Sequence, residues 1–452
     1  MKQLYYKIVI AIFTALPLAG MAQSFVVSVP FYDRIENSIV REVSYGNTVS
    51  YVETSSDQWI VFASMGSSTI QKLQIPSNIF MTDLYLHEEF VYFCGYDNSN
   101  NHGVWGWFDT SAVQLASNGI THFNSFNCTN CDVEKFNSLV VYSRGPILFV
   151  ALVGSAIDAL SNIWACTVSI NGTAGITTGW NYTIGLSPDL DERLTNICLT
   201  DNYVVVAGSA GLSCRSELYR IHNRYSMWDG QADRRYCFPW GMVVVDHYWE
   251  EFALTHVGGD IIAAATPCRN YYNPLNLDGV LINVYDLQQT LTNYCCIPPV
   301  SSMEYDNLGV IGQYHIKDLR YSTVNKLFSI LMTGTFNSIG NNTIIAQIQY
   351  PGGTTLEMFA RKDVTSFSMD HFMNQSRPLA MGRDDINPTN SLYLTLPNLL
   401  QGNCFNYNSD PLPSGQFDSK SDLAPYSTCN GKYDCVIKQV SVNETNANIE
   451  CQ

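Results

Sequence analysis

The chain has 452 residues, of which 14% are charged and 12% aromatic, and its formal net charge is −16. Nucleic acids and anionic lipid surfaces bind proteins through dense lysine and arginine, so this acidic balance argues against both as partners. The 27 tyrosines and 21 phenylalanines argue against disorder and favour a β-rich fold. Neutral glycans, proteins and cations remain compatible with the composition.

A secretory signal peptide is predicted at residues 1–22. Lys2 and Lys7 precede the apolar run Ile8–Leu18. The small residues Gly20 and Ala22 fit a cleavage site before Gln23. The apolar run is well short of the ~20 residues that span a bilayer. We therefore expect an exported protein, periplasmic, cell-surface or extracellular, without membrane insertion after cleavage.

A strand–turn–strand unit recurs along most of the chain, and Thr195–Ile221 shows it most clearly. It reads as a short apolar strand, a polar turn, a buried strand Tyr203–Ala207 that stops at Gly208, and an alternating strand Glu217–Ile221. Apolar runs of four to eight residues bounded by Gly, Asn, Asp and Ser are strand signals. We expect Tyr203–Ala207 to be the strand of its unit nearest the centre of the fold.

Seven stretches follow this order. They are Val49–Leu73, Thr82–Thr110, Val133–Ile170, Thr195–Ile221, Phe252–Leu287, Ile316–Tyr350 and Val364–Leu396. The small residues that end their buried strands are Ser64, Gly95, Gly154, Gly208, Ala265, Gly334 and Gly382, separated by 31, 59, 54, 57, 69 and 48 residues.

These intervals predict a β-propeller, because a four-stranded blade takes ~40–50 residues. The expected fold is an all-β propeller of about seven four-stranded blades over residues 48–397. The short first interval leaves six, seven or eight blades open. A pair of β-sandwiches is the alternative, but it does not require one motif to recur throughout the chain.

The segments on either side of the repeat region differ from it in composition. Residues 23–47 form an N-terminal segment with strand-like runs, and residues 398–452 are rich in Asn, Ser, Asp and Pro and contain four cysteines. In closed propellers a strand from one terminus often completes a blade begun at the other, and either end could supply it. We expect the C-terminal residues to form a disulfide-tied tail packed on the last unit, with a small separate module as the alternative.

The cysteine content favours disulfides, because an exported chain with 14 cysteines has an even number available for pairing. The expected local pairs are Cys198 with Cys214 and Cys237 with Cys268, together with pairs within Cys404, Cys429, Cys435 and Cys451. Cys128 and Cys131 have CxxC spacing, but no second pair or histidine follows at ligand spacing. A loop disulfide is therefore favoured there over a zinc or redox site.

Arginine and aromatic residues are interleaved in Arg215–Glu251, which makes this segment the candidate binding region. Arg, Trp and Tyr anchor protein interfaces and stack on sugar rings. The alternative is that the arginines pair with surplus carboxylates while the aromatic residues cap blades. The candidate binding residues are Arg220, Arg224, Tyr225, Trp228, Arg234, Arg235 and Trp240.

No catalytic, metal or cofactor motif is present, so the sequence assigns no catalytic residue, metal ligand or cofactor. Asp370 and His371 are adjacent, and neighbours in a strand point to opposite faces, so they are not a ready-made acid–base couple. The favoured function is a non-enzymatic binding or scaffold protein that recognises a glycan or a protein through propeller loops. The alternative is a carbohydrate-active hydrolase or lyase with acidic residues in the central pocket.

The signal segment with Met-Ala-Gln at its cleavage site, together with the glycine-closed strand repeats, resembles uncharacterised exported β-propeller-like proteins of Gram-negative bacteria. The resemblance covers most of residues 48–397 and rests on this pattern. It implies an exported propeller and carries over no functional residue.

Overall fold

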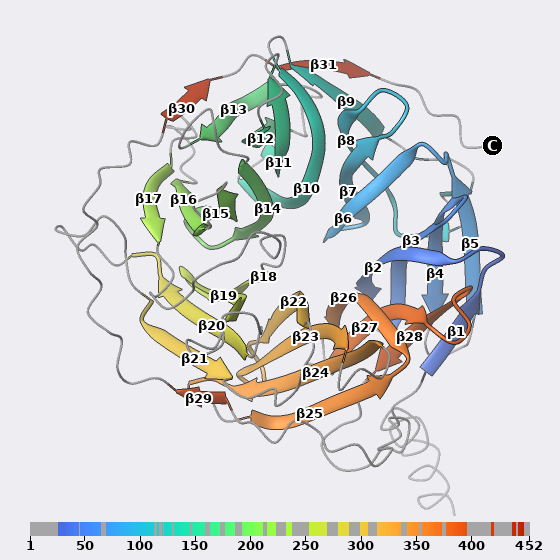
Figure 1. The fold of residues 1–452 in the computed structure, drawn as a ribbon. Coiled ribbons are helices and arrows are strands. Elements are labelled where there is room, and N and C mark those ends of the chain that lie inside the picture. The colour runs from blue at the N-terminus through green and yellow to red at the C-terminus, as the bar shows by residue number, and fades with distance from the viewer. Residues whose placement is uncertain are drawn as a thin grey trace, which may run out of the picture.

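The computed structural model describes most of the chain between residues 26 and 395 and three short stretches beyond it (Figure 1). The described residues are 26–44, 46–64, 69–112, 115–116, 120, 122–128, 131–144, 147–158, 163–171, 177–185, 192–210, 215–222, 232–236, 253–268, 279–288, 299–305, 314–335, 341–351, 355–372, 377–395, 417–419, 436–439 and 442–446. The predicted signal peptide lies outside them. No helix among these residues has the length and hydropathy needed to cross a membrane.

The strands form seven antiparallel sheets around a central axis (Figure 1). Sheet 1 contains β2 (Ile35–Ser44), β3 (Asn47–Thr54), β4 (Gln58–Ser64) and β5 (Thr69–Ile75). Sheet 2 contains β6 (Ile79–His87), β7 (Phe90–Asp97), β8 (His102–Asp109) and β9 (His122–Cys128). Sheet 3 contains β10 (Cys131–Arg144), β11 (Ile147–Asp158), β12 (Ile163–Asn171) and β13 (Thr177–Gly185).

Sheet 4 contains β14 (Glu192–Leu199), β15 (Tyr203–Ala210), β16 (Arg215–His222) and β17 (Ala232–Tyr236). Sheet 5 contains β18 (Ala253–Gly258), β19 (Ile261–Cys268), β20 (Gly279–Asp286) and β21 (Ser301–Tyr305). Sheet 6 contains β22 (Tyr314–Ser322), β23 (Leu327–Thr335), β24 (Asn341–Gln349) and β25 (Thr355–Lys362). Sheet 7 contains β26 (Val364–Phe372), β27 (Arg377–Asp384), β28 (Asn390–Thr395) and β1 (Val26–Pro30). This radial arrangement confirms the predicted all-β propeller.

The N-terminal strand closes the ring. β1 pairs antiparallel with β28 from Val26↔Leu394 to Pro30↔Asn390, so a strand from the start of the chain completes sheet 7. Each innermost strand contacts the next, and β26 of the last sheet contacts β2 of the first. Residues 23–47, which the sequence sets apart, therefore supply one strand to each of the two sheets that meet at the closure.

The apolar core is divided into seven clusters, each lying between two neighbouring sheets. β15 shows how one strand serves two of them. Val204 and Val206 pack with sheet 3, whereas Val205 and Ala207 pack with sheet 5. Successive side chains of a strand point to opposite faces, so a strand that lies between two sheets is buried on both faces and is mostly apolar.

This packing corrects the predicted positions of the inner strands. The buried runs expected nearest the axis are second strands in six sheets, and Tyr203–Ala207 lies in β15, one place out from β14. In sheet 1 the chosen run belongs to β4, the third strand. The innermost strands border the axis and alternate in burial, as β6 and β18 do. The short interval from Ser64 to Gly95 thus joins a third strand to a second one.

Each of the seven innermost strands contains a β-bulge or similar register shift, and in six of them a small polar residue follows such a shift. These residues are Asn37, Asp83, Ser138, Asn196, Asp318 and Ser368. At Asn37, Asp83 and Asp318 the side-chain oxygen accepts a hydrogen bond from the next backbone N–H, at 2.8–2.9 Å. A bulge bends its strand and redirects the side chains beside it, so it places polar groups where the sheets converge.

Asp260, in the turn between β18 and β19, joins sheet 5 to sheet 4. Its carboxylate is buried and accepts hydrogen bonds from Thr200 Oγ1 at 3.0 Å, Asn202 N at 2.9 Å and Asn202 Nδ2 at 2.7 Å. Gln288 Nε2 donates a further bond at 2.7 Å. Burial alone would raise the pKa of Asp260, but these donors outweigh it and lower the pKa.

Replacing Asp260 with Asn should lower the free energy of unfolding at pH 7 by about 2 kcal/mol, because an amide cannot accept all of these bonds. The depressed folded pKa means that the wild-type contribution is present at neutral pH and is lost as the pH falls through that pKa. Denaturant midpoints of the two proteins should therefore converge in acid. A difference that stays constant down to pH 3 would contradict this role.

Candidate functional site

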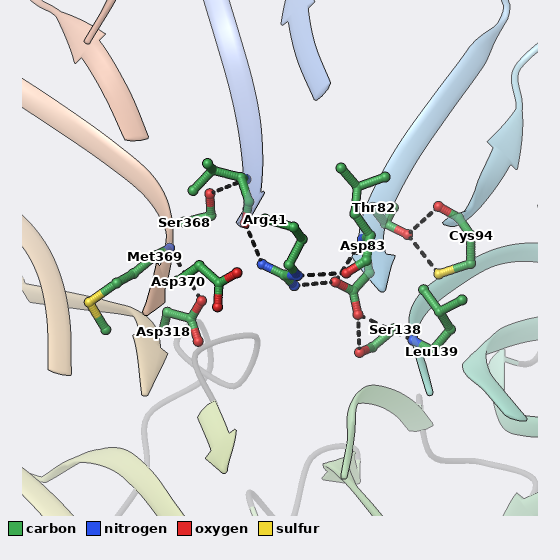
Figure 2. A network of polar contacts seen from close by, with 12 residues as sticks. Arg41, Thr82, Asp83, Cys94, Ser138, Leu139, Asp318, Ser368, Met369 and Asp370 are labelled. Atoms are coloured by element: carbon green, nitrogen blue, oxygen red, sulfur yellow. Dashed lines mark hydrogen bonds and ion pairs between the residues drawn. The ribbon is translucent and has the colours of Figure 1, made fainter. Parts of the chain in front are cut away.

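Five charged side chains from four consecutive sheets gather at the propeller axis. Arg41 comes from β2, Asp83 from β6, Asp318 and Arg320 from β22, and Asp370 from β26. We call these residues the axial cluster, part of which is drawn in Figure 2. The cluster brings sheets 6, 7, 1 and 2 together and includes the place where the ring closes.

Asp83 is the most heavily bonded carboxylate of the axial cluster (Figure 2). Its Oδ1 accepts from Arg41 Nη2 at 2.6 Å, and its Oδ2 accepts from Ser138 Oγ at 2.6 Å and from Leu139 N at 3.2 Å. The side chains of Arg41 and Asp83 are each 14% exposed. Asp83 therefore ties its own sheet to sheet 1 through an ion pair and to sheet 3 through two hydrogen bonds.

Arg41 is fixed by backbone oxygens as well as by Asp83. Its Nε donates to Leu84 O at 2.6 Å and its Nη1 donates to Val40 O at 2.8 Å. All three nitrogens of its guanidinium are thus engaged within the protein.

The other half of the axial cluster joins sheets 6, 7 and 1. Asp318 Oδ2 accepts from Arg320 Nη2 at 3.0 Å and from Met369 N at 3.3 Å, while Arg320 Nε donates to Met369 O at 3.3 Å. Asp370 Oδ2 accepts from Glu42 N at 2.9 Å. Each of these carboxylates therefore carries at least one contact that crosses between two sheets.

The burial of these groups shifts their pKa values. Burial raises the pKa of Asp318, although Arg320 and Arg41 oppose the shift. Burial also works against the charge on Arg320, but Asp318, Asp370 and Asp83 outweigh it and raise the pKa of that guanidinium. Arg320 therefore stays protonated and compensates the carboxylates around it.

Sequence reasoning did not find the axial cluster, although a signal exists. Asp83 and Asp318 each lie two positions after an apolar residue, in a strand that carries the bulge. Ser138 and Asn196 occupy the same place in their strands. The repeat that predicts the propeller lies on the buried second strands, whereas this shorter pattern lies on the innermost strands.

His371 lies beside the axial cluster with its Nε2 buried and without a hydrogen-bond partner. Burial lowers the pKa of His371 to about 4; Asp370 opposes the shift and Arg320 adds to it. The ring is therefore neutral at pH 7. His371 and Asp370 have different surroundings, as expected for neighbours on one strand.

Stability should fall as the pH drops from about 6.5, the ordinary histidine pKa, to about 4, because only the unfolded chain takes up the proton of His371 in this range. We expect this histidine to account for on the order of 2–3 kcal/mol of that loss. His371→Gln should remove it and flatten the pH profile of the denaturation midpoint. Parallel profiles for the two proteins would contradict a neutral, buried His371.

The axial cluster is built for cohesion more than for acid–base chemistry. A glycosidase needs one carboxylic acid and one carboxylate facing a substrate across ~5–10 Å. In the cluster, both oxygens of Asp83 and both oxygens of Asp318 already accept hydrogen bonds from the protein. Among the described residues, no three His, Cys, Asp or Glu side chains are grouped so that they could hold a metal ion.

The candidate binding residues fall partly on the outer strands of sheet 4. Arg220 lies in β16 opposite Arg234 of β17, and Tyr219 lies opposite Arg235. The register thus brings three of the predicted arginines to one corner of the sheet. The remaining candidates, Arg224, Tyr225, Trp228 and Trp240, lie outside the described residues.

Two buried cysteines, Cys94 in β7 and Cys198 in β14, have free thiols in the structure. Cys214, the predicted partner of Cys198, lies outside the described residues. Cys198 packs between sheets 4 and 5 with Val205 and Ile262, which explains its apolar surroundings. Cys214, Cys237, Cys404, Cys429, Cys435 and Cys451 lie outside the described residues, and Cys128, Cys131 and Cys268 are strand residues whose side chains the structure does not describe.

Both free thiols should resist alkylation in the folded protein. Burial raises the pKa of Cys198 to about 12, with Arg320 opposing the shift, and burial also raises the pKa of Cys94. Since the thiolate is the reactive form, iodoacetamide at pH 8 should leave both unmodified until denaturant is added. Peptide mass mapping checks this, and rapid native labelling of Cys198 would contradict it.

No protein-family model matches the chain, and no curated protein matches it in sequence. Among solved structures, the chain is similar to one described as "Structure of Dos1 propeller". The TM-score is 0.45, the sequence identity is 10%, and the match covers 81% of each chain.

Proposed function

We propose that the protein is an exported binding or scaffold protein that recognises a glycan or a protein through loops and edges of its propeller, without catalysing a reaction. The observation that supports this most is the bonding of the axial carboxylates. Asp83 and Asp318 each hold neighbouring sheets together. The residues at the axis therefore stabilise the ring, and we place ligand binding on the outer strands and loops.

The basic corner of sheet 4 is the proposed recognition surface. Arg220 and Arg234 occupy opposite positions on adjacent strands, in a chain with a formal net charge of −16. Arginine combined with nearby tryptophan and tyrosine suits both protein interfaces and the faces of sugar rings. Trp228 and Arg224 belong to the same proposed surface on sequence grounds.

A glycan array and a protein pull-down, run beside a hydrolysis screen on the same glycans, test this proposal. Arg224→Ala combined with Trp228→Ala should lower ligand affinity at least tenfold, and Arg220→Ala with Arg234→Ala should do the same. Arg34→Ala is the matched control, because Arg34 is 57% exposed and forms a surface ion pair with Glu36. Unchanged binding by both double variants would overturn the proposed surface.

The hydrolysis screen separates this function from the enzymatic alternative. Burial raises the pKa of Asp318, which is the property a general acid requires. If the protein cleaves any glycan and Asp318→Asn abolishes the cleavage, the axis is catalytic and the binding proposal fails.

A further inference from the structure

The ring is complete without its C-terminal residues. All seven sheets have four strands before the tail is counted, and β1 closes the last of them. Three sheets then carry a fifth strand from the end of the chain, drawn in red at the rim in Figure 1. These are β29 (Phe417–Ser419) on sheet 5, β30 (Val436–Gln439) on sheet 3 and β31 (Val442–Asn446) on sheet 2.

The tail strands form sheet pairs only with outermost strands. β31 pairs antiparallel with β9 over five residue pairs, β30 with β13 over four, and β29 with β21 over three. An outermost strand offers a row of backbone N–H and C=O groups to any extended chain. Recognition of this kind works through main-chain hydrogen bonds, and such short ladders are among the first elements of a fold to open.

We propose that the outer edges of β9, β13 and β21 are strand-acceptor sites and that their partner is the C-terminal region of a second copy of this chain. Every copy carries both the donor strands and the acceptor edges. The same backbone hydrogen bonds therefore form whether the tail pairs within its own chain or with a neighbour. Exchange of an identical element between copies is a low-cost route to a dimer.

A long connection precedes the first tail strand. Residues 396–416 connect β28 to β29, and a chain of about 20 residues spans up to ~70 Å when extended. The choice between the two arrangements then depends on protein concentration relative to the effective concentration of the tethered tail. This inference concerns self-association and is independent of the proposed ligand-binding function.

A proline variant of the full-length protein tests the proposal. Backbone N–H groups of consecutive residues point to opposite edges of a strand, so two adjacent prolines remove a ladder donor in either register. The variant carries Ile437→Pro, Lys438→Pro, Glu444→Pro and Thr445→Pro, and the matched control carries alanine at the same four positions. Near-ultraviolet circular dichroism checks that the propeller is retained in both.

Sedimentation velocity should show a concentration-dependent dimer for the wild type and the alanine control, and at least a tenfold weaker dimer for the proline variant. A fluorescent peptide of residues 436–446 should bind the proline variant, whose acceptor edges are free, more tightly than it binds the wild type. Dimerisation that the prolines leave unchanged would overturn the proposal. So would a wild type that stays monomeric up to ~100 µM, or a proline variant that does not bind the peptide.

Discussion

Replacing Asp83 with Ala should lower the free energy of unfolding by about 3–5 kcal/mol, because breaking a buried charge pair leaves the other charge uncompensated. The guanidinium of Arg41 would lose its carboxylate, and the hydroxyl of Ser138 and the N–H of Leu139 would lose their acceptor. Chemical denaturation followed by tryptophan fluorescence measures the change. The loss should appear as a lower midpoint for the whole transition, since Asp83 joins three sheets.

Two controls separate the ion pair from the other bonds of Asp83. In a double-mutant cycle with Arg41→Ala, the two substitutions should couple by at least 1 kcal/mol, as contacting residues do. Arg34→Ala should cost less than about 0.5 kcal/mol, because its ion pair with Glu36 is exposed to solvent. Strict additivity of Asp83→Ala and Arg41→Ala would show that the pair contributes nothing beyond its separate hydrogen bonds.

The propeller was predictable because its second strands are buried on both faces. In β15 this burial produces the continuous apolar run Tyr203–Ala207, which ends at Gly208, and similar runs recur along the chain. That a terminal strand closes the ring was predictable, because the last sheet would otherwise leave an unpaired edge. Which strands pair there was not predictable. Nothing local to Val26–Pro30 names β28 as its partner, because that pairing joins residues more than 350 positions apart.

The axial cluster was not predictable from the repeat. Asp83 and Asp318 occupy equivalent positions, yet one pairs with Arg41 of the preceding sheet and the other with Arg320 of its own strand. Which side chains meet at the axis depends on how closely the seven innermost strands approach one another there. The local sequence of one strand does not determine the distance between strands. The burial of Cys198 was not predictable for a related reason, because cysteine spacing carries no information on burial.

The bulges also explain why glycine ends several of the buried second strands. Gly95 pairs with Met81 just before the bulge of β6, and Gly154 pairs with Phe136 just before the bulge of β10. There the two backbones approach so closely that a Cβ on Gly95 would overlap the carbonyl oxygen of Phe80, and one on Gly154 that of Lys135. The motif that identified the repeat is therefore a steric consequence of the bulge on the adjacent strand.

Gly95→Ala should consequently destabilise the protein by about 3 kcal/mol or more, since the overlapping atom is backbone and cannot rotate away. Gly259→Ala is the matched control: its φ of +58° is unfavourable for alanine, but no atom lies within 4 Å of the added Cβ. That substitution should cost only about 1–2 kcal/mol. Denaturation midpoints of the two variants compare overlap with backbone conformation directly. Equal losses would mean that the bulge relaxes to admit a methyl group. Glycine would then be required at the end of these strands for its backbone conformation and not for its small size.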